Sequence, residues 1–205
     1  MSDLATVRAA LHSRPPRLAQ QDDTPRASVA AIFHEMADDP QGTDPSDLNN
    51  VRLLFIERAT RDGDPWSGDL AFPGGRVEPE DTDIHHTAER ETQEEIGWTL
   101  APTERLGRLD DMTGSVIPIT VAACVYATQQ VQTPTLSTEV VDVFWTPVAD
   151  LIDPQRRVVH TLQGRSEERQ FPALDVLGPG RPLLWGVTYR FVTDLMRFFG
   201  HELPT

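Results

Sequence analysis

Short apolar runs alternate with polar, turn-forming stretches along most of the chain, and this pattern predicts several strands and a few helices. Two runs suit buried strands, namely residues 51–56 and the β-rich stretch 116–126. Further strands are expected at residues 28–33, 70–73 and 139–145, and residues 157–161 and 168–171 are expected to pair with each other.

The clearest helix is expected at about residues 82–96, where good helix formers follow one another until Gly97 ends the run. Asp81, Thr82 or Asp83 could cap its start. Other helices are expected at residues 148–152 and 185–199. The resulting order of elements, with more strands than helices, predicts the α/β class, with a mixed sheet covered by helices.

The length and the apolar content suit one domain with an N-terminal extension. The chain has 205 residues, of which 39% are hydrophobic. Leu4, Val7 and Leu11 recur at helical spacing before a polar stretch that begins with two prolines. We therefore expect an N-terminal helix and linker at residues 1–27 and a single domain at residues 28–205.

The sequence contains no signal for export or for membrane insertion. No stretch approaches the roughly 18 consecutive apolar residues of a membrane span, and the first residues lack the apolar core of a signal peptide. The single cysteine, Cys124, lies in an apolar run, which favours a buried small hydrophobe. We expect a cytoplasmic protein without membrane partners.

The chain is strongly acidic, with a formal net charge of -14. A protein of this charge is a poor candidate for binding a nucleic-acid polymer through its phosphates. It can still bind a small anionic substrate if metal ions supply positive charge locally. All 18 basic residues are arginine, which excludes Schiff-base and P-loop lysines, whereas the arginine fork suits phosphate groups.

Three glutamates lie close together in the helix expected at residues 82–96. Glu91 and Glu95 are four residues apart on one face, and Glu94 lies beside them. Like charges at this spacing, near a helix C-terminus, weaken the helix. A bound cation explains them, and the alternative is a solvated acidic face. Mg²⁺ or Mn²⁺ would suit these oxygen ligands, anchor a diphosphate and activate a water molecule for a nearby carboxylate base.

Residues 75–98 resemble the Nudix box, the signature of a family of metal-dependent hydrolases. The family pattern is a glycine, a spaced acidic residue and then Arg-Glu-x-x-Glu-Glu-x-Gly. The matching positions are Gly75, Asp81, Arg90, Glu91, Glu94, Glu95 and Gly97. The resemblance implies a Nudix-type α/β/α sandwich around a mixed β-sheet, with the box forming a loop–helix–loop.

The resemblance also implies roles for the residues of the box. In the family, the positions equivalent to Glu91 and Glu95 bind metal, and the position of Glu94 binds metal or serves as the base. Gly75 would offer its backbone carbonyl to a metal ion. Arg90 would make an internal salt bridge that holds the loop, with Asp81 and Gly97 as further structural positions of the motif.

The spacing within the box resembles one branch of the family, the coenzyme A diphosphatase-like proteins. Eight residues, instead of the usual seven, separate the acidic Asp81 from Arg90. The same branch shows the Phe-Pro-Gly-Gly sequence of residues 72–75, a glycine at the place of Gly68, and similar segments around Arg58 and at residues 184–188. The preceding loop departs from that branch, because Asp64 stands where a second arginine is usual.

Four residues outside the box are further candidates for the site. Glu139 is either a base or metal ligand, or an exposed carboxylate at a strand end. Arg58 and Arg76 could clamp phosphate, and Trp66 could stack on an adenine or pack against the sheet. Glu78 and Glu80 are expected to be solvated loop residues, and His85 and His86 to be surface residues. Trp185 and Tyr189 fit the buried face of the C-terminal helix and are expected in the core.

The expected activity is cleavage of the diphosphate bond of a nucleoside diphosphate linked to another moiety. Coenzyme A or an acyl-coenzyme A is the first substrate hypothesis, and ADP-ribose, dinucleotides and nucleoside triphosphates remain open. The alternative is a sensor that binds a nucleotide without turning it over, against which the intact Glu91, Glu94 and Glu95 argue. The partner is then a small nucleotide-type molecule, and the N-terminal helix could mediate a homodimer.

Overall fold

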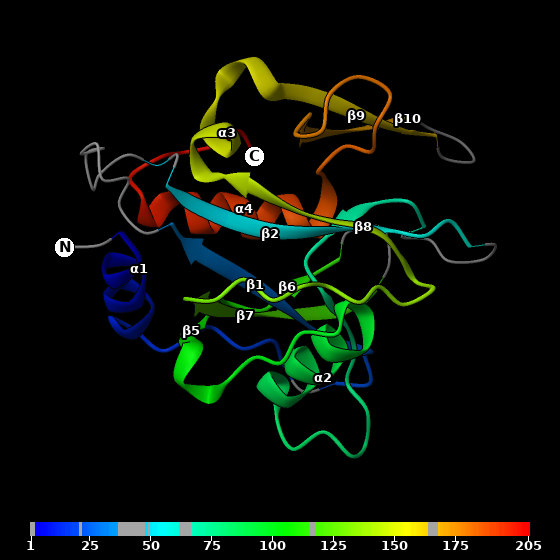
Figure 1. Ribbon diagram of the computed structural model, residues 1–205. Helices are drawn as coiled ribbons and strands as arrows, with labels where there is room; N and C mark the ends of the chain where they lie inside the picture. The colour runs from blue at the N-terminus through cyan, green and yellow to red at the C-terminus, as the bar shows by residue number, and fades with distance from the viewer. Residues whose placement is uncertain are drawn as a thin grey trace.

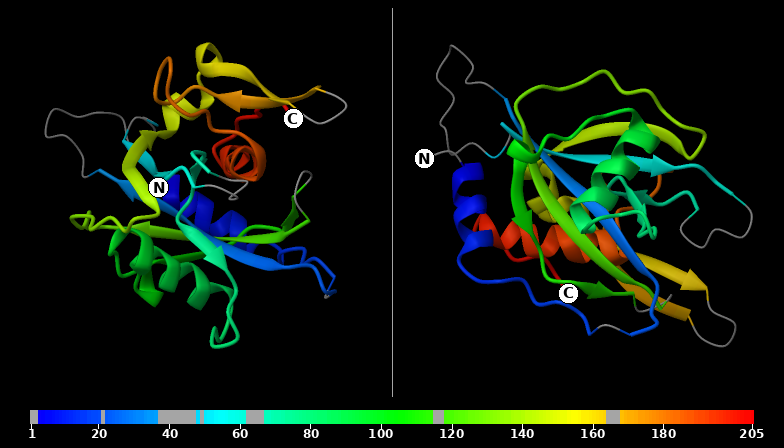
Figure 2. Two further views of the ribbon diagram at one scale, coloured as in Figure 1. Left: turned by 90° about the vertical axis from the view of Figure 1, so that its right-hand side faces the viewer. Right: turned by 90° about the horizontal axis from the view of Figure 1, so that it is seen from below.

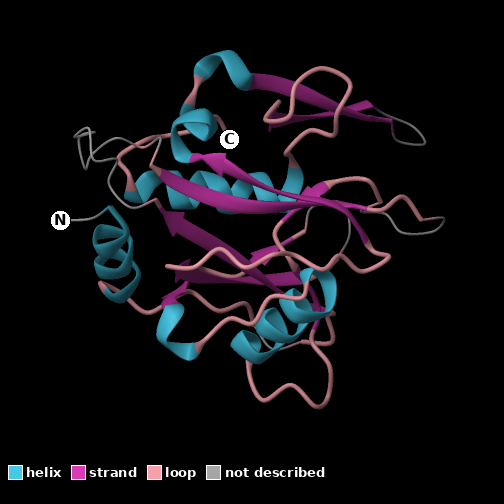
Figure 3. Ribbon diagram, in the orientation of Figure 1, coloured by secondary structure: helices cyan, strands magenta, loops and turns pink. Residues whose placement is uncertain are grey.

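The structure, a computed structural model, describes residues 3–20, 22–36, 48, 50–61, 67–114, 118–163 and 168–205. In this part of the chain a mixed β-sheet has helices on both faces (Figures 1 and 3). The sheet strands are β1 (Arg26–Glu35), β2 (Val51–Arg58), β3 (Leu70–Ala71), β4 (Gly74–Arg76), β5 (Arg105–Arg108), β6 (Met112–Thr113), β7 (Thr120–Thr128) and β8 (Val140–Pro147). A separate hairpin consists of β9 (Arg157–Gln163) and β10 (Glu168–Leu174). The helices are α1 (Asp3–His12), α2 (Ile84–Ile96), α3 (Val148–Ile152) and α4 (Gly186–Phe198), with 3-10 turns at Pro102–Glu104 and Pro154–Arg156.

The sheet is mixed because one central pair of strands is parallel. Its main path runs β3-β2-β1-β7-β5, and β1 and β7 pair in parallel over their length. The other pairings are antiparallel, including β8 with β2 and β4 with the start of β1. The sequence predicted a mixed sheet, and this prediction is confirmed.

The central strands β1, β2 and β7 are buried on both faces, so each contributes to two separate cores. In β2, Leu53 and Phe55 point into one core, and Leu54 and Ile56 point into the other. Such alternation follows from the strand geometry, in which successive side chains face opposite sides of the sheet. Burial on both faces explains why residues 51–56 are continuously apolar.

Helices cover the two cores unequally (Figure 2). α2 covers the core that contains Leu54, through Ala88 and Ile96. α1, α3 and α4 cover the opposite core, with Val7 of α1 and Leu195 of α4 fully buried in it. The expected α/β/α sandwich is therefore confirmed. α1 packs on the same core as α3 and α4. A domain boundary at residue 27 stays a prediction.

Several element boundaries differ from the sequence-based expectation. The strand expected at residues 70–73 is shorter in the structure: β3 ends at Ala71 and pairs with β2, and a further strand, β4, begins at Gly74 and pairs with β1. Pro73 separates them, because proline has no N–H for a ladder. The strand expected at 116–126 begins at Thr120 as β7, and residues 116 and 117 lie outside the described residues.

Two of the three side chains that were expected in the core are buried. Cys124 and Tyr189 are buried, as expected. Trp185 is only half-buried and precedes α4, so its placement on the buried face of that helix is wrong. Among the described residues, every helix is too short or too polar to cross a lipid bilayer.

Candidate active site

Local sequence signals fix both ends of α2. The Asp83 side chain accepts a hydrogen bond from the backbone N–H of His86 at 2.8 Å, so Asp83 is the N-cap. Gly97 adopts a left-handed conformation, with φ of 73°, and its N–H bonds to the Gln93 carbonyl. Both signals were visible in the sequence. They set the register that turns Glu91 and Glu95 toward β4.

Glu95 is the most buried carboxylate of the site, with 3% of its surface exposed. Its Oε2 accepts a hydrogen bond from Gly74 N–H at 2.9 Å, and its Oε1 lies 3.5 Å from Arg58 Nη1. Burial raises the pKa of Glu95 to about 7, and the charges of Glu91 and Glu139 act in the same direction. The bond from Gly74 and the charge of Arg58 oppose this shift. A cation placed beside this carboxylate would favour its ionised form.

Glu91 lies directly against the backbone of Gly75. A Cβ atom added at Gly75 would overlap the Glu91 carboxyl group, so only glycine permits this approach. Burial raises the pKa of Glu91, the neighbouring Arg90 opposes the shift, and the charge of Glu94 adds to it. The Glu91 carboxylate is therefore held in direct contact with the backbone of Gly75.

Arg90 braces the loop that leads into α2. Its Nε and Nη2 donate to the two carboxylate oxygens of Asp81 at 3.1 and 3.0 Å, and Nη2 also donates to the Arg76 carbonyl at 3.1 Å. The Asp81 carboxylate also accepts hydrogen bonds from Glu78 N–H and from the Thr87 hydroxyl, each at 2.9 Å. An aspartate at the altered spacing thus still makes a two-pronged pair with the arginine.

The Asp81–Arg90 pair is expected to stabilise the fold in a pH-dependent way. The bond from Arg90 holds the pKa of Asp81 well below its usual range, so the stabilisation is present above about pH 4 and is lost as the pH falls further. We expect Asp81→Asn to lower the free energy of unfolding by about 3 kcal/mol at pH 7, because it removes the buried carboxylate that binds two nitrogens of Arg90. Urea denaturation at pH 7 and at pH 3 measures both quantities.

A matched control for this prediction is Asp150→Asn, which breaks the more exposed pair of Asp150 with Arg156 (2.8 Å). A pair of this kind contributes less than about 1 kcal/mol. Equal losses in the two variants, or a loss for Asp81→Asn that is the same at both pH values, would contradict the bracing role.

The donor atoms of the site suit a hard divalent cation. The carboxylates of Glu91, Glu94 and Glu95 and the Gly75 carbonyl offer oxygen ligands only. Among the described residues, no three acidic, histidine or cysteine side chains are already gathered as a finished metal site. Arg90 accounts for part of this, because its Nη1 donates to Glu91 at 2.9 Å and to Glu94 at 3.1 Å. Arg90 thus engages one oxygen of each of these two carboxylates.

Glu139 lies at the rim of the site, one residue before β8. Its backbone carbonyl accepts a hydrogen bond from Ala59 N–H at 2.8 Å, just after β2 ends. Its carboxylate binds Arg61 Nη1 at 2.8 Å and is about half exposed. It is close enough to Glu95 for its charge to raise the pKa of that group. Glu139 is thus within electrostatic range of Glu95, while its direct side-chain partner is Arg61.

Arg61 was not identified from the sequence. Besides Glu139, it contacts Thr138, to whose hydroxyl it donates at 3.1 Å. These contacts join residues nearly 80 positions apart, so no local sequence motif predicts them. The only signal was its position three residues after Arg58, at the end of a strand that leads toward the site.

The remaining candidates are placed less centrally. Arg76 is exposed, and its backbone carbonyl is bonded to Arg90. Trp66 lies outside the described residues. Glu78 and Glu80 are exposed, as expected.

The expectation of a surface residue is wrong for His85. His85 lies in the first turn of α2, its half-buried ring has Nδ1 3.1 Å from the Tyr126 hydroxyl of β7, and burial lowers its pKa. Tyr126 donates to Glu89, which Arg105 binds with two nitrogens at 2.7 and 2.9 Å. This network fastens α2 to β7 and β5. His86 is more exposed and accepts a hydrogen bond from Thr82 N–H.

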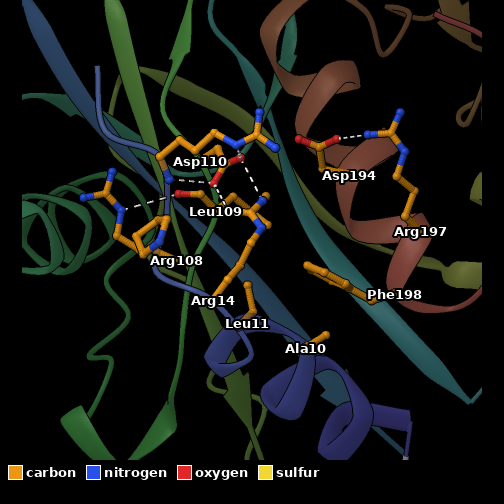
Figure 4. A pocket seen from close by; sticks show the side chains of 11 residues that line it. Ala10, Leu11, Arg14, Arg108, Leu109, Asp110, Asp194, Arg197 and Phe198 are labelled. Atoms are coloured by element: carbon orange, nitrogen blue, oxygen red, sulfur yellow. Dashed lines mark hydrogen bonds and ion pairs between the residues drawn. The ribbon is translucent and has the colours of Figure 1, made fainter. Parts of the chain in front are cut away.

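A cleft lies between α1 and α4, away from the residues of the candidate site (Figure 4). It is a cleft of about 340 Å³, and none of the site residues predicted from the sequence lines it. Arg14 and Arg17 bind Asp110 there, and Arg197 binds Asp194. Its positive charges thus have carboxylate partners within the chain, which suits a structural role in holding α1 in place.

The sequence of this chain is similar to those of known proteins. The NUDIX domain model matches residues 43–165. The mitochondrial coenzyme A diphosphatase NUDT8 of Homo sapiens is 33% identical over 141 residues, which cover 66% of this chain and 58% of that protein. The same protein of Mus musculus is 33% identical over 148 residues, which cover 70% of this chain and 68% of the relative. The match thus spans little more than half of the human relative.

A solved structure supports the fold alone. The MutT/nudix family protein from Enterococcus faecalis superposes with a TM-score of 0.55 at 15% identity, covering 92% of this chain and 66% of that chain.

Proposed function

Since the chain belongs to the NUDIX domain family and is a Nudix hydrolase, we propose that it cleaves the diphosphate bond of a nucleoside diphosphate linked to another moiety. The observation that carries the proposal is the convergence of Glu91 and Glu95 on the Gly74–Gly75 backbone. Nudix hydrolases generally use divalent metal ions. We assign Glu91, Glu94, Glu95 and the Gly75 carbonyl as the groups that hold Mg²⁺ or Mn²⁺ here.

Hydrolysis forms a bond between a water oxygen and one phosphorus and breaks the bond from that phosphorus to the bridging oxygen, which leaves as part of a monophosphate. A bound divalent cation would lower the pKa of the water and offset charge in the transition state. The chain supplies a base for the water proton, and we assign this role to Glu94 or Glu139. Arg58 and Gly74 N–H hold Glu95 in place.

We propose that the phosphates are bound by the arginines around the site. Arg58 is the last residue of β2, Arg61 lies three residues beyond it, and Arg76 is exposed at the end of β4. The guanidinium fork matches phosphate oxygens. Trp66 is proposed as a stacking partner for an adenine, from its position in the sequence four residues before Leu70.

Coenzyme A or an acyl-coenzyme A is the proposed substrate. The human and mouse relatives are named coenzyme A diphosphatases, and the sequence of residues 72–75 with Gly68 resembles that branch. The products would be adenosine 3′,5′-bisphosphate and phosphopantetheine. Asp64, at the place of an arginine, is the feature that favours keeping ADP-ribose, dinucleotides and nucleoside triphosphates in the test. The cytoplasmic location and the homodimer stay predictions.

A substrate panel tests the proposal. Coenzyme A, acetyl-coenzyme A, ADP-ribose, NADH and diadenosine polyphosphates are each incubated with the full chain and Mg²⁺, Mn²⁺ or a chelator, and products are separated by chromatography. We expect metal-dependent release of adenosine 3′,5′-bisphosphate from coenzyme A. Cleavage of another compound instead would reassign the substrate. If no compound is cleaved, while a nucleotide raises the melting temperature, the sensor hypothesis replaces this one.

A further inference from the structure

The segment just before α4 bridges the β9–β10 hairpin and the loop that leads into the site. Leu184 exchanges two backbone hydrogen bonds with Leu174 at the end of β10, both 2.9 Å long. The next residue, Trp185, donates its indole N–H to Asp69 Oδ1 at 2.9 Å. Trp185 and Asp69 are more than 100 positions apart in sequence, so this contact is purely tertiary.

Asp69 lies at the end of the β2–β3 ladder, opposite Arg58. Its backbone carbonyl accepts the hydrogen bond of Arg58 N–H at 3.0 Å, and the next residue, Leu70, pairs with Glu57. Arg181 donates to the Glu57 carboxylate at 2.6 Å from the same pre-helix segment. Residues 181–185 therefore hold the β2–β3 ladder at two neighbouring points.

Stacking on the hairpin fixes the orientation of Trp185. Its ring lies 4.1 Å from the His160 ring at an interplanar angle of 25°, and 5.5 Å from the Phe171 ring. His160 and Phe171 are cross-strand partners in the hairpin. In Figure 1 the hairpin lies above α4, on the side of that helix away from the sheet. The indole thus joins two parts of the fold that share no strand pairing within the described residues.

The β2–β3 ladder held by Trp185 and the segment that follows it, up to the start of β4, carry the two groups that hold Glu95. Arg58 lies at the end of β2 and approaches Oε1, and Gly74 lies five residues after Asp69 and donates to Oε2. A shift of residues 68–74 would move both donors relative to the buried carboxylate. An error of about 1 Å in such a position is enough to cost a large part of a catalytic rate.

We propose that Trp185 and Asp69 are positioning residues, whose hydrogen bond keeps Arg58 and Gly74 in register with Glu95. This inference rests on the proposed hydrolase function of the same site. It also gives a physical reason for the late segment at residues 184–188 to accompany the box, since that segment completes the support of the catalytic carboxylate.

The first test is Trp185→Phe, which keeps an aromatic ring on His160 but removes the N–H. We expect kcat for the cleaved diphosphate to fall roughly tenfold while KM changes less than about twofold, because the rate depends on the geometry of the carboxylate. Tyr189→Phe is the matched control. It removes a 2.7 Å hydrogen bond to the Pro204 carbonyl one turn along α4 and is expected to leave kcat unchanged.

A double-mutant cycle shows whether the two residues act through one bond. Asp69→Ala removes the acceptor and is expected to lower kcat as much as Trp185→Phe, and the double variant is expected to be no slower than either. Asp69→Asn keeps an acceptor oxygen and is expected to restore most of the rate. Independent effects that multiply in the double variant would overturn the proposal, and so would a kcat of Trp185→Phe within twofold of the wild type.

Hydrogen exchange separates this inference from the proposed function. Amides of residues 57–71 are expected to exchange faster in Trp185→Phe than in the wild type and in Tyr189→Phe. If the wild type cleaves none of the compounds tested, the proposed function fails, and the exchange data alone decide whether the bond holds the ladder. Unchanged exchange in this segment would overturn the positioning role.

Discussion

Glu95→Gln is expected to lower kcat by at least about 10²-fold while leaving the fold intact. The substitution removes the charge that a metal ion needs, but glutamine keeps an oxygen that can accept the hydrogen bond from Gly74 N–H. Burial already raises the pKa of Glu95 to about 7, so its ionised form opposes folding above the unfolded-state pKa of about 4. Without metal, the variant is therefore expected to melt no lower than the wild type at pH 8.

The measurement is a steady-state rate with the compound identified in the panel, together with a melting curve in the presence of a chelator. Glu80→Gln is the control, since Glu80 is an exposed carboxylate of the loop before α2. It is expected to retain kcat within about twofold, as surface substitutions usually do. A Glu95→Gln enzyme that keeps the wild-type rate would remove Glu95 from the chemistry.

Gly75→Ala is expected to reduce kcat by about 10²-fold with little loss of stability. The added Cβ would meet the Glu91 carboxyl group, which is the mobile end of a side chain and can turn aside. Gly75 has no left-handed backbone conformation to strain. The substitution thus displaces a proposed metal ligand and leaves the packing around it in place.

Gly180→Ala provides the opposite combination. Gly180 has a φ of 81°, and a Cβ there would have open space, so alanine costs about 1 kcal/mol of stability through backbone strain alone. We expect this variant to melt lower and to keep its activity. Rates and melting temperatures of both variants test the prediction, and a Gly75→Ala enzyme that loses stability but not activity would contradict it.

The sequence predicted those parts of the site that local spacing determines. Glu91, Glu94 and Glu95 were identified because helical geometry alone brings them together, and Asp83 and Gly97 set the ends of that helix through local hydrogen bonds. The resemblance to a known motif predicted an internal salt bridge of Arg90 without naming its partner, and the structure shows Asp81 in that place with both carboxylate oxygens engaged.

Contacts that depend on the tertiary fold were not predictable in the same way. Arg61 reaches Glu139 only because β8 pairs with β2, and the sequence gives no register for that pairing. Trp185 was read as a core residue because aromatic residues near a helix are usually buried. Its indole N–H instead requires a partner, and the fold supplies Asp69.

The same limit applies to the strand break at Pro73. The apolar run at residues 70–73 predicts one strand, but proline has no N–H for a ladder, and the strand ends before Pro73. The Pro73 carbonyl accepts a hydrogen bond from Ala30 N–H at 2.8 Å. The break turns Gly74 and Gly75 toward β1 and α2. The position of the Gly74 N–H that holds Glu95 is thus a consequence of which strands pair.

The most direct test of the central claim is the affinity of the full chain for Mn²⁺, measured by electron paramagnetic resonance. The wild type is compared with three variants, Glu91→Gln, Glu95→Gln and Glu80→Gln. We predict that the wild type and Glu80→Gln bind Mn²⁺ alike, and that Glu91→Gln and Glu95→Gln each weaken binding by at least about tenfold, because each removes a charged oxygen ligand. Equal Mn²⁺ affinity in all four proteins would contradict the assignment of the α2 carboxylates as the metal site.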